Sequence, residues 1–244
     1  MKPFLLLGTR ADDDVADNEY EAFLGFTGLD EPGLRRHRLE AVPLGALDLD
    51  DWSGIFMGGG PFNSSDPADE KSATQRRVEA ELDLLLDDVV ARDFPLLGAC
   101  YGIGAIGTHQ GAVVDRTFSE PIGRVPISLT PAGVDDQLFK AVPTTFEAFV
   151  GHKEAVRELP AHATLLAWSA ACPVQAFRIG QHVYATQFHP ELDVHGLCLR
   201  IEAYRYHGYF EPDEMEELQE MARQASVHDP PKLLQRFVEL YARS

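Results

Sequence analysis

Residues 94–102 read Phe94-Pro95-Leu96-Leu97-Gly98-Ala99-Cys100-Tyr101-Gly102. The stretch begins as an apolar run, typical of a buried strand, and stops at a cysteine flanked by small residues. A nucleophile on a sharp strand-to-helix turn needs such neighbours, because the backbone there is strained and crowded. The positive end of the following helix would also favour a negatively charged sulfur at Cys100. Taken alone, the stretch fits an inert, buried cysteine equally well.

On both sides of this stretch, short apolar runs alternate with amphipathic segments, which predicts an α/β fold. The clearest helix spans residues 78–90, where the apolar side chains recur along one face. Further helices are expected at 15–26 and 194–207. Strands are expected at residues 4–9, 34–39, 55–57, 94–99, 111–118, 124–129, 146–150, 165–168, 174–179 and 182–188.

Two amphipathic segments follow residue 211, where the composition changes. We therefore predict one domain over residues 1–210 and a helical extension over 211–244. Helices of this length must bury their apolar faces to persist. The faces can be covered by the domain itself, by a second copy in a homodimer, or by another partner.

The 244 residues carry 39 acidic and 21 basic side chains, a net charge of −18. Such a surface repels phosphate backbones, so nucleic acid is not an expected partner. No apolar run is long enough to cross a membrane. The three cysteines, Cys100, Cys172 and Cys198, are odd in number and widely spaced, which predicts a reducing cytoplasm rather than a disulfide framework. We expect Cys172 and Cys198 to be buried core thiols, and neither the cysteines nor the remaining histidines have metal-ligand spacing.

A second motif, Thr186-Gln187-Phe188-His189-Pro190-Glu191, ends another apolar strand. Residues two apart in an extended segment share a face, so His189 and Glu191 can address one pocket. A carboxylate beside an imidazole fixes its tautomer and stabilises the imidazolium that forms when the ring takes a thiol proton. Alone, the motif would fit a surface turn, but with Cys100 it completes an ordered cysteine–histidine–glutamate set.

A third motif, Gly58-Gly59-Gly60-Pro61, follows the strand at 55–57. Attack of a thiolate on an amide carbonyl creates an oxyanion, which needs preorganised N–H donors. A glycine-rich turn can supply one such donor, and the backbone of Tyr101 can supply a second.

The glycine–proline loop, the Gly-x-Cys-x-Gly turn and the His-Pro-Glu motif together resemble the class I glutamine amidotransferases, most closely the glutaminase domain of GMP synthetases and its stand-alone relatives. The resemblance implies a flavodoxin-like, mostly parallel twisted sheet with helices on both faces and the site at the carboxyl ends of its strands. It also implies hydrolysis of the γ-amide of glutamine through a glutamyl thioester, without a cofactor. By position, Gly60 and Tyr101 would be the oxyanion donors.

The sequence departs from the family pattern in three places. Gly104 stands where the family usually has a glutamine that helps to hold the substrate, and this change would leave room beside the helix. Lys153 and Glu154 replace the glycine and aspartate of a His-Gly-Asp-x-Val segment. No synthetase domain follows, so we expect ammonia to be released or passed to a separate protein. Two alternatives remain open: hydrolysis of a γ-glutamyl amide or peptide, supported by Gly104, and a non-catalytic regulatory or binding subunit.

Overall fold

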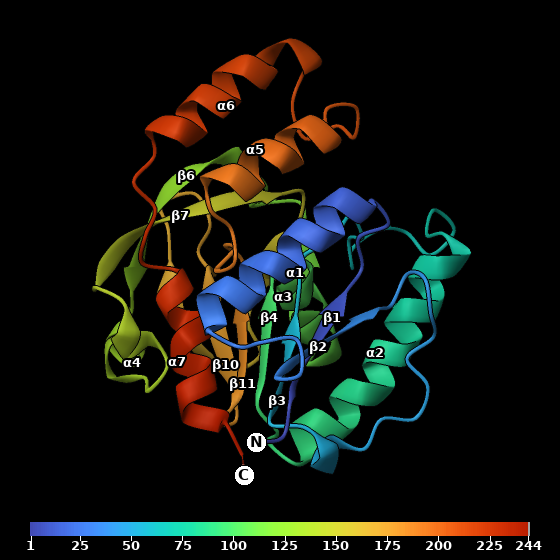
Figure 1. Ribbon diagram of the computed structural model, residues 1–244. Helices are drawn as coiled ribbons and strands as arrows, with labels where there is room; N and C mark the ends of the chain where they lie inside the picture. The colour runs from blue at the N-terminus through green and yellow to red at the C-terminus, as the bar shows by residue number, and fades with distance from the viewer. Residues whose placement is uncertain (244) are drawn as a thin grey trace.

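The computed structural model describes residues 1–243 and shows a mixed sheet with helices on both faces (Figure 1). The strands of this sheet are β1 (Phe4–Gly8), β2 (Leu34–Arg38), β3 (Gly54–Met57), β4 (Leu96–Ala99), β6 (Glu120–Leu129), β7 (Thr145–His152), β9 (Thr164–Trp168), β10 (Ala176–Ile179) and β11 (Val183–Thr186). Their order is β2-β1-β3-β4-β11-β10-β9-β6-β7. The pairs from β2 to β11 are parallel, and those from β11 to β7 are antiparallel. The predicted flavodoxin-like fold is thereby confirmed.

The helices are α1 (Asp13–Thr27), α2 (Ala73–Ala91), α3 (Tyr101–His109), α4 (Pro131–Asp135), α5 (Val194–Ala203), α6 (Met215–Gln224) and α7 (Pro231–Tyr241). Side chains at the N-caps accept hydrogen bonds at the start of four of these helices, α1, α2, α4 and α5. Asp12 accepts a hydrogen bond from the Val15 N–H, and Ser72 accepts one from the Gln75 N–H. Gly28 ends α1 with a φ of 72°, a left-handed conformation that favours glycine.

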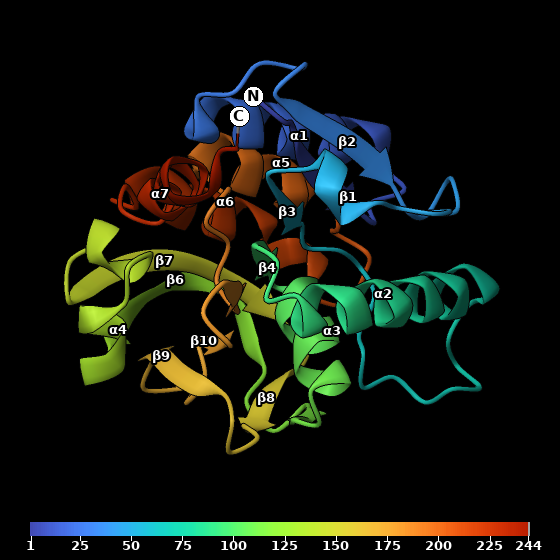
Figure 2. The ribbon, with the colours of Figure 1, turned by 90° about the horizontal axis from the view of Figure 1, so that it is seen from below.

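Strand β1 shows how the sheet divides the interior into two cores. Phe4 and Leu6 belong to one apolar cluster, whereas Leu5 and Leu7 belong to another. Successive side chains of a strand point to opposite faces, so both faces of β1 are buried. The first cluster lies under α1 and α7, and the second under α2 and α3, on opposite sides of the parallel strands (Figure 2).

The segment after residue 210 packs against the rest of the molecule in two places. Helix α6 lies on α5, while α7 lies on α1. Leu233, Leu234 and Phe237 of α7 are completely buried, and the Phe237 ring lies 5.0 Å from that of Phe56. Helix α7 therefore helps to close one core, and a domain boundary at residue 210 stays a prediction. Among the helices of residues 1–243, none combines the length and hydropathy that a bilayer crossing requires.

Local structure differs from expectation around the small second sheet. Strand β5 (Val113–Asp115) is shorter than the predicted strand at 111–118, and it pairs with β8 (Ala155–Glu158), which the pattern did not predict. The sequence of β8 lacks the alternation typical of a strand, because two buried residues are followed by the exposed pair Arg157-Glu158. The helix expected at 194–207 stops at Ala203, and the chain then turns irregularly through Gly208.

Candidate active site

Four loops meet at one edge of the sheet because β1, β3, β4 and β11 are parallel. Their carboxyl ends lead into Arg10, the glycine run 58–60, Cys100 and His189. All four regions line one pocket, whose other walls include parts of β6, β7, α5 and the segment after α5. The fold thus brings together motifs that lie up to 179 positions apart, counting from Arg10 to His189.

Cys100 occupies a strained turn between β4 and α3. Its φ of 53° and ψ of −96° are unusual for a residue with a side chain. The backbone is held there because the Cys100 N–H donates to the Thr186 carbonyl at 2.8 Å. Gly98 and Gly102 give the turn its room: a Cβ at Gly98 would lie 2.8 Å from Ile106 Cδ1, and one at Gly102 would lie 3.3 Å from the Met57 carbonyl. The sulfur therefore stands at the start of α3, half-buried beside the pocket.

His189 and Glu191 form a close, buried pair. The distance from His189 Nδ1 to Glu191 Oε1 is 2.8 Å. The Glu191 side chain is completely buried, and the His189 N–H donates to the Phe149 carbonyl at 3.2 Å. Because Nδ1 faces the carboxylate, Nε2 is the ring nitrogen left for a reacting group.

The pKa values of this pair are shifted in opposite directions. Burial by itself would lower the pKa of His189, but Glu191 and the Cys100 sulfur outweigh it and raise that pKa to about 9. Burial would raise the pKa of Glu191, but His189 and Arg200 hold it well below its usual range. The geometry therefore favours a charged imidazolium–carboxylate pair.

Behind the pair lies a chain of alternating charges that the sequence analysis did not predict. Arg200 Nη1 donates to Glu191 Oε1 at 3.0 Å, and its Nη2 lies 3.5 Å from Glu19 Oε1. Glu19 also accepts from Arg10 Nε at 2.8 Å, and Arg10 donates to the Tyr204 hydroxyl at 2.8 Å. Arg10, Glu19 and Arg200 are each at most 5% exposed. One feature of the sequence could have indicated this chain of charges. Arg200 is a charged residue on the apolar face of α5, beside Leu197 and Ile201.

The glycine run is packed against these side chains. A Cβ at Gly59 would lie 2.7 Å from His189 Cε1 and 3.4 Å from Cys100 Cβ, so both side chains lie close to the bare Cα of Gly59. A Cβ at Gly58 would lie 2.8 Å from Glu19 Oε2, and one at Gly60 would lie 1.9 Å from Thr9 Oγ1. A side chain at any of the three positions would therefore displace one of these neighbours.

Two tyrosines contribute to the wall of the pocket that holds Cys100. Gly60, Cys100 and His189 line it together with Tyr204 and Tyr209. Tyr101, by contrast, begins α3 with its side chain buried on the α2 side, where its ring meets that of Phe62 edge-on at 5.8 Å. A role for Tyr101 in the pocket therefore rests on its backbone N–H.

Comparison with known proteins shows the family of the chain. The family model of the class-I glutamine amidotransferases matches residues 35–197, more than half of the chain. The chain belongs to this family. A glutamine-hydrolysing GMP synthase subunit of Thermoplasma acidophilum is 29% identical over 147 residues, which are 60% of this chain and 66% of that subunit. The GMP synthase of Petrotoga mobilis is 25% identical over 150 residues, 60% of this chain but 26% of that enzyme. The chain thus matches just under two thirds, or less, of these two relatives.

The fold is also that of solved amidotransferases. A glutamine amidotransferase of Thermotoga maritima superposes with a TM-score of 0.74 over the full length of both chains, at 19% identity. A crystal structure of a glutamine amidotransferase from Methylobacillus flagellatus superposes with a TM-score of 0.69 at 18% identity, over the full length of this chain and 97% of that one. Identities this low speak for the shared fold alone.

The room expected beside Gly104 is absent from the folded chain. A Cβ on Gly104 would lie 2.5 Å from Glu154 Oε1 and 3.0 Å from Ser64 Oγ. The prediction of space for a larger γ-glutamyl substrate was wrong. The side chain of Glu154, which is longer than the aspartate it replaces, fills that space.

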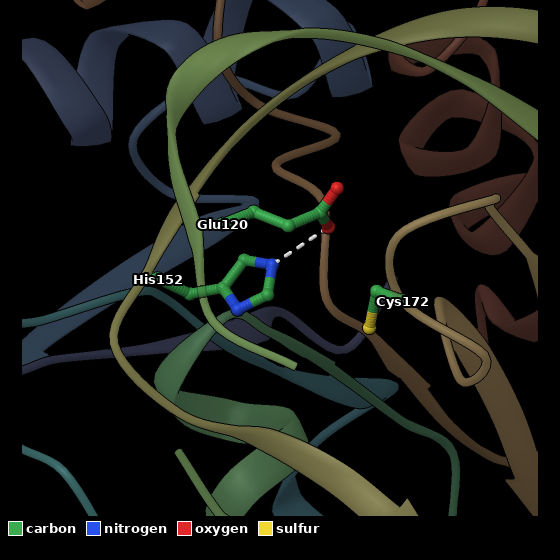
Figure 3. Close-up of side chains that lie close together, drawn as sticks. All are labelled: Glu120, His152 and Cys172. Atoms are coloured by element: carbon green, nitrogen blue, oxygen red, sulfur yellow. Dashed lines mark hydrogen bonds and ion pairs between the residues drawn. The ribbon is translucent and has the colours of Figure 1, made fainter. Parts of the chain in front are cut away.

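A second cluster that contains a histidine lies outside the set of residues that line the pocket (Figure 3). Glu120, His152 and Cys172 offer ligand atoms within 4.8 Å of one another. However, His152 Nε2 contacts Glu120 Oε2 at 3.0 Å and its Nδ1 contacts the Glu154 carbonyl at 2.9 Å, so both ring nitrogens are occupied. Burial raises the pKa of the Cys172 thiol to about 12, which keeps it protonated. We therefore interpret the cluster as a buried hydrogen-bonded network.

The two remaining cysteines differ in their burial. Cys172 is completely buried and is the core thiol that was predicted. Cys198 is only partly buried, because it lies on α5 at the contact with α6, where its sulfur is 3.9 Å from the Gln219 carbonyl. The prediction of a core thiol at Cys198 was therefore wrong in degree.

Proposed function

We propose that the protein hydrolyses the γ-amide of glutamine, with Cys100 as nucleophile, His189 as proton carrier and Glu191 orienting the histidine. The observation that carries the proposal is the convergence of a strained cysteine and a carboxylate-backed histidine on Gly59. Membership of the amidotransferase family supports glutamine as the substrate.

In this mechanism His189 holds the proton taken from the Cys100 thiol, in keeping with its raised pKa. The thiolate attacks the γ-carbonyl carbon, and the N–H groups of Gly60 and Tyr101 bind the oxyanion. His189 then gives its proton to the departing nitrogen, so ammonia leaves and a glutamyl thioester remains. Water, deprotonated by His189, attacks the thioester and releases glutamate and the thiol.

The ammonia would pass to a synthetase on a separate chain. Relatives in Thermoplasma acidophilum and Pyrococcus abyssi that are named as subunits of a glutamine-hydrolysing GMP synthase support this assignment, since the word implies a companion chain. We place the protein in the cytoplasm, because its three cysteines are free thiols and thiols persist in a reducing compartment.

The test is release of ammonia and glutamate from glutamine by the purified protein, alone and with a separate GMP synthetase chain. Cys100→Ser is the control, since serine is a far weaker nucleophile without a system tuned for it. A panel of γ-glutamyl amides and peptides is assayed beside glutamine. Turnover of glutamine that survives Cys100→Ser, or turnover of γ-glutamyl peptides alone, would refute the proposal.

A further inference from the structure

Two departures from the family pattern, Gly104 and Glu154, touch each other in the folded protein. They lie 50 positions apart, on α3 and just before β8. The Glu154 carboxylate fills the space beside Gly104, where a Cβ would come within 2.5 Å of Oε1. Glycine costs helical stability, and Gly104 is therefore best explained by this contact.

The hydrogen bonds of the Glu154 carboxylate are to the glycine-rich loop, residues 58–66. Its Oε1 accepts from the Ser64 N–H at 2.8 Å, and its Oε2 accepts from the Ser65 N–H at 2.7 Å. The side chain is 6% exposed, so both hydrogen bonds are shielded from water. Hydrogen bonds from N–H groups to a carboxylate are shorter and stronger than neutral ones.

This loop carries the oxyanion donor proposed at Gly60, four residues before Ser64. Two side chains also hold the loop through its carbonyls: Gln75 Nε2 donates to the Asn63 carbonyl at 2.9 Å, and Lys71 Nζ donates to the Ser64 carbonyl at 2.9 Å. Those contacts tie the loop to α2 and the turn before it. Glu154 ties it instead toward α3, the helix that Cys100 immediately precedes.

We propose that Glu154 is a positioning residue, which fixes the glycine-rich loop against α3 through the space that Gly104 leaves. The inference rests on the proposed function, since the loop matters for turnover through the Gly60 N–H. One carboxylate spans the two elements that supply the nucleophile and the oxyanion donor. Residues 104 and 154 together therefore set the distance between the glycine-rich loop and α3.

Glu154→Gln tests the anchor, with Glu158→Gln, an exposed carboxylate on the neighbouring strand, as the matched control. Glutamine keeps the volume, but its amide NH₂ must face one of the two N–H donors. We expect amide hydrogen exchange at Ser64 and Ser65 to accelerate, and kcat for glutamine to fall by about tenfold to a hundredfold. KM and the rate of Cys100 alkylation should change little, because the interaction with the oxyanion exists only in the transition state.

The reciprocal test is Gly104→Ala, with Gly25→Ala in α1 as control, because a Cβ at Gly25 meets no atom within 4 Å. Gly104→Ala should push the carboxylate away and lower kcat, and Glu154→Asp in the same chain should restore part of it by shortening the side chain. Unchanged exchange at Ser64 and Ser65 in Glu154→Gln overturns the anchor, and so does a Gly104→Ala variant with full kcat. If the unmodified protein turns over no glutamine, the proposed function fails, while hydrogen exchange still decides whether the anchor exists.

Discussion

Replacing Glu191 by glutamine isolates the charge of the buried carboxylate. The change preserves shape at a side chain with no exposed surface, so packing should survive. What is lost is the charge that faces His189 Nδ1 at 2.8 Å. Burial then lowers the pKa of His189, and of the two groups that raise it only the Cys100 sulfur remains.

The expected loss of turnover in Glu191→Gln follows from the shift in the pKa of His189. The pKa of His189 is raised from 6.5 to about 9, and a gap of that size corresponds to about 3 kcal/mol of differential interaction. We expect the pKa in the variant to fall by at least about one unit. A complete return to 6.5 would reduce the imidazolium fraction near pH 8 from about 90% to about 3%, so turnover there would drop by up to about 30-fold. His189→Ala, which removes the proton carrier itself, should cost more, about 10²–10⁴-fold.

Stability should follow the same titration. Because the folded-state pKa of His189 is raised, its favourable contribution is fully present below pH 6.5 and is lost as pH rises through about 9. The stability difference between the unmodified protein and Glu191→Gln should therefore be largest near pH 6 and should shrink above pH 9.

The assay combines an NMR titration of the His189 ring with the pH profile of glutamine hydrolysis. Glu202→Gln, an exposed carboxylate on the same α5 helix as Arg200, is the control. A Glu191→Gln protein whose His189 still titrates near 9, with unimpaired turnover, would refute the reasoning. It would show that another group orients the imidazole.

Three further outcomes are expected. An alkylating agent should label Cys100 well before Cys172, which is buried and has a pKa raised to about 12; mass spectrometry showing equal labelling of the folded protein would contradict this. Gly59→Ala should reduce turnover sharply, because the new Cβ would lie 2.7 Å from His189 Cε1, whereas Gly25→Ala should leave kinetics unchanged. Truncation after residue 210 removes α7, which buries three large apolar side chains, and should cost more than about 5 kcal/mol. A truncated protein with an unchanged melting temperature and elution volume would argue against that magnitude.

The linear sequence was sufficient for features that depend on neighbouring residues. Periodicity along residues 78–90 indicated α2, which spans Ala73–Ala91. Glycines on both sides of Cys100 indicated a crowded turn, and the structure shows the atoms that crowd it. The spacing of His189 and Glu191 was enough to place both on one face, because residues two apart in an extended segment share a face by geometry.

Contacts between distant segments could not be predicted in this way. The buried chain Glu191–Arg200–Glu19–Arg10 joins β1, α1, α5 and the end of β11, and each member alone has the pattern of an ordinary charged residue. The second sheet was missed for the same reason: β8 is recognisable only from its pairing with β5.

Gly104 shows most clearly the difference between what the sequence predicts and what the tertiary structure decides. From the sequence it is a missing side chain, which predicts empty space and a different substrate. In the tertiary structure a residue 50 positions away fills that space and uses it to hold a third segment. The order of residues determines the local chemistry of a segment. Whether a volume is filled depends on every element that packs around it, so only the folded chain decides it.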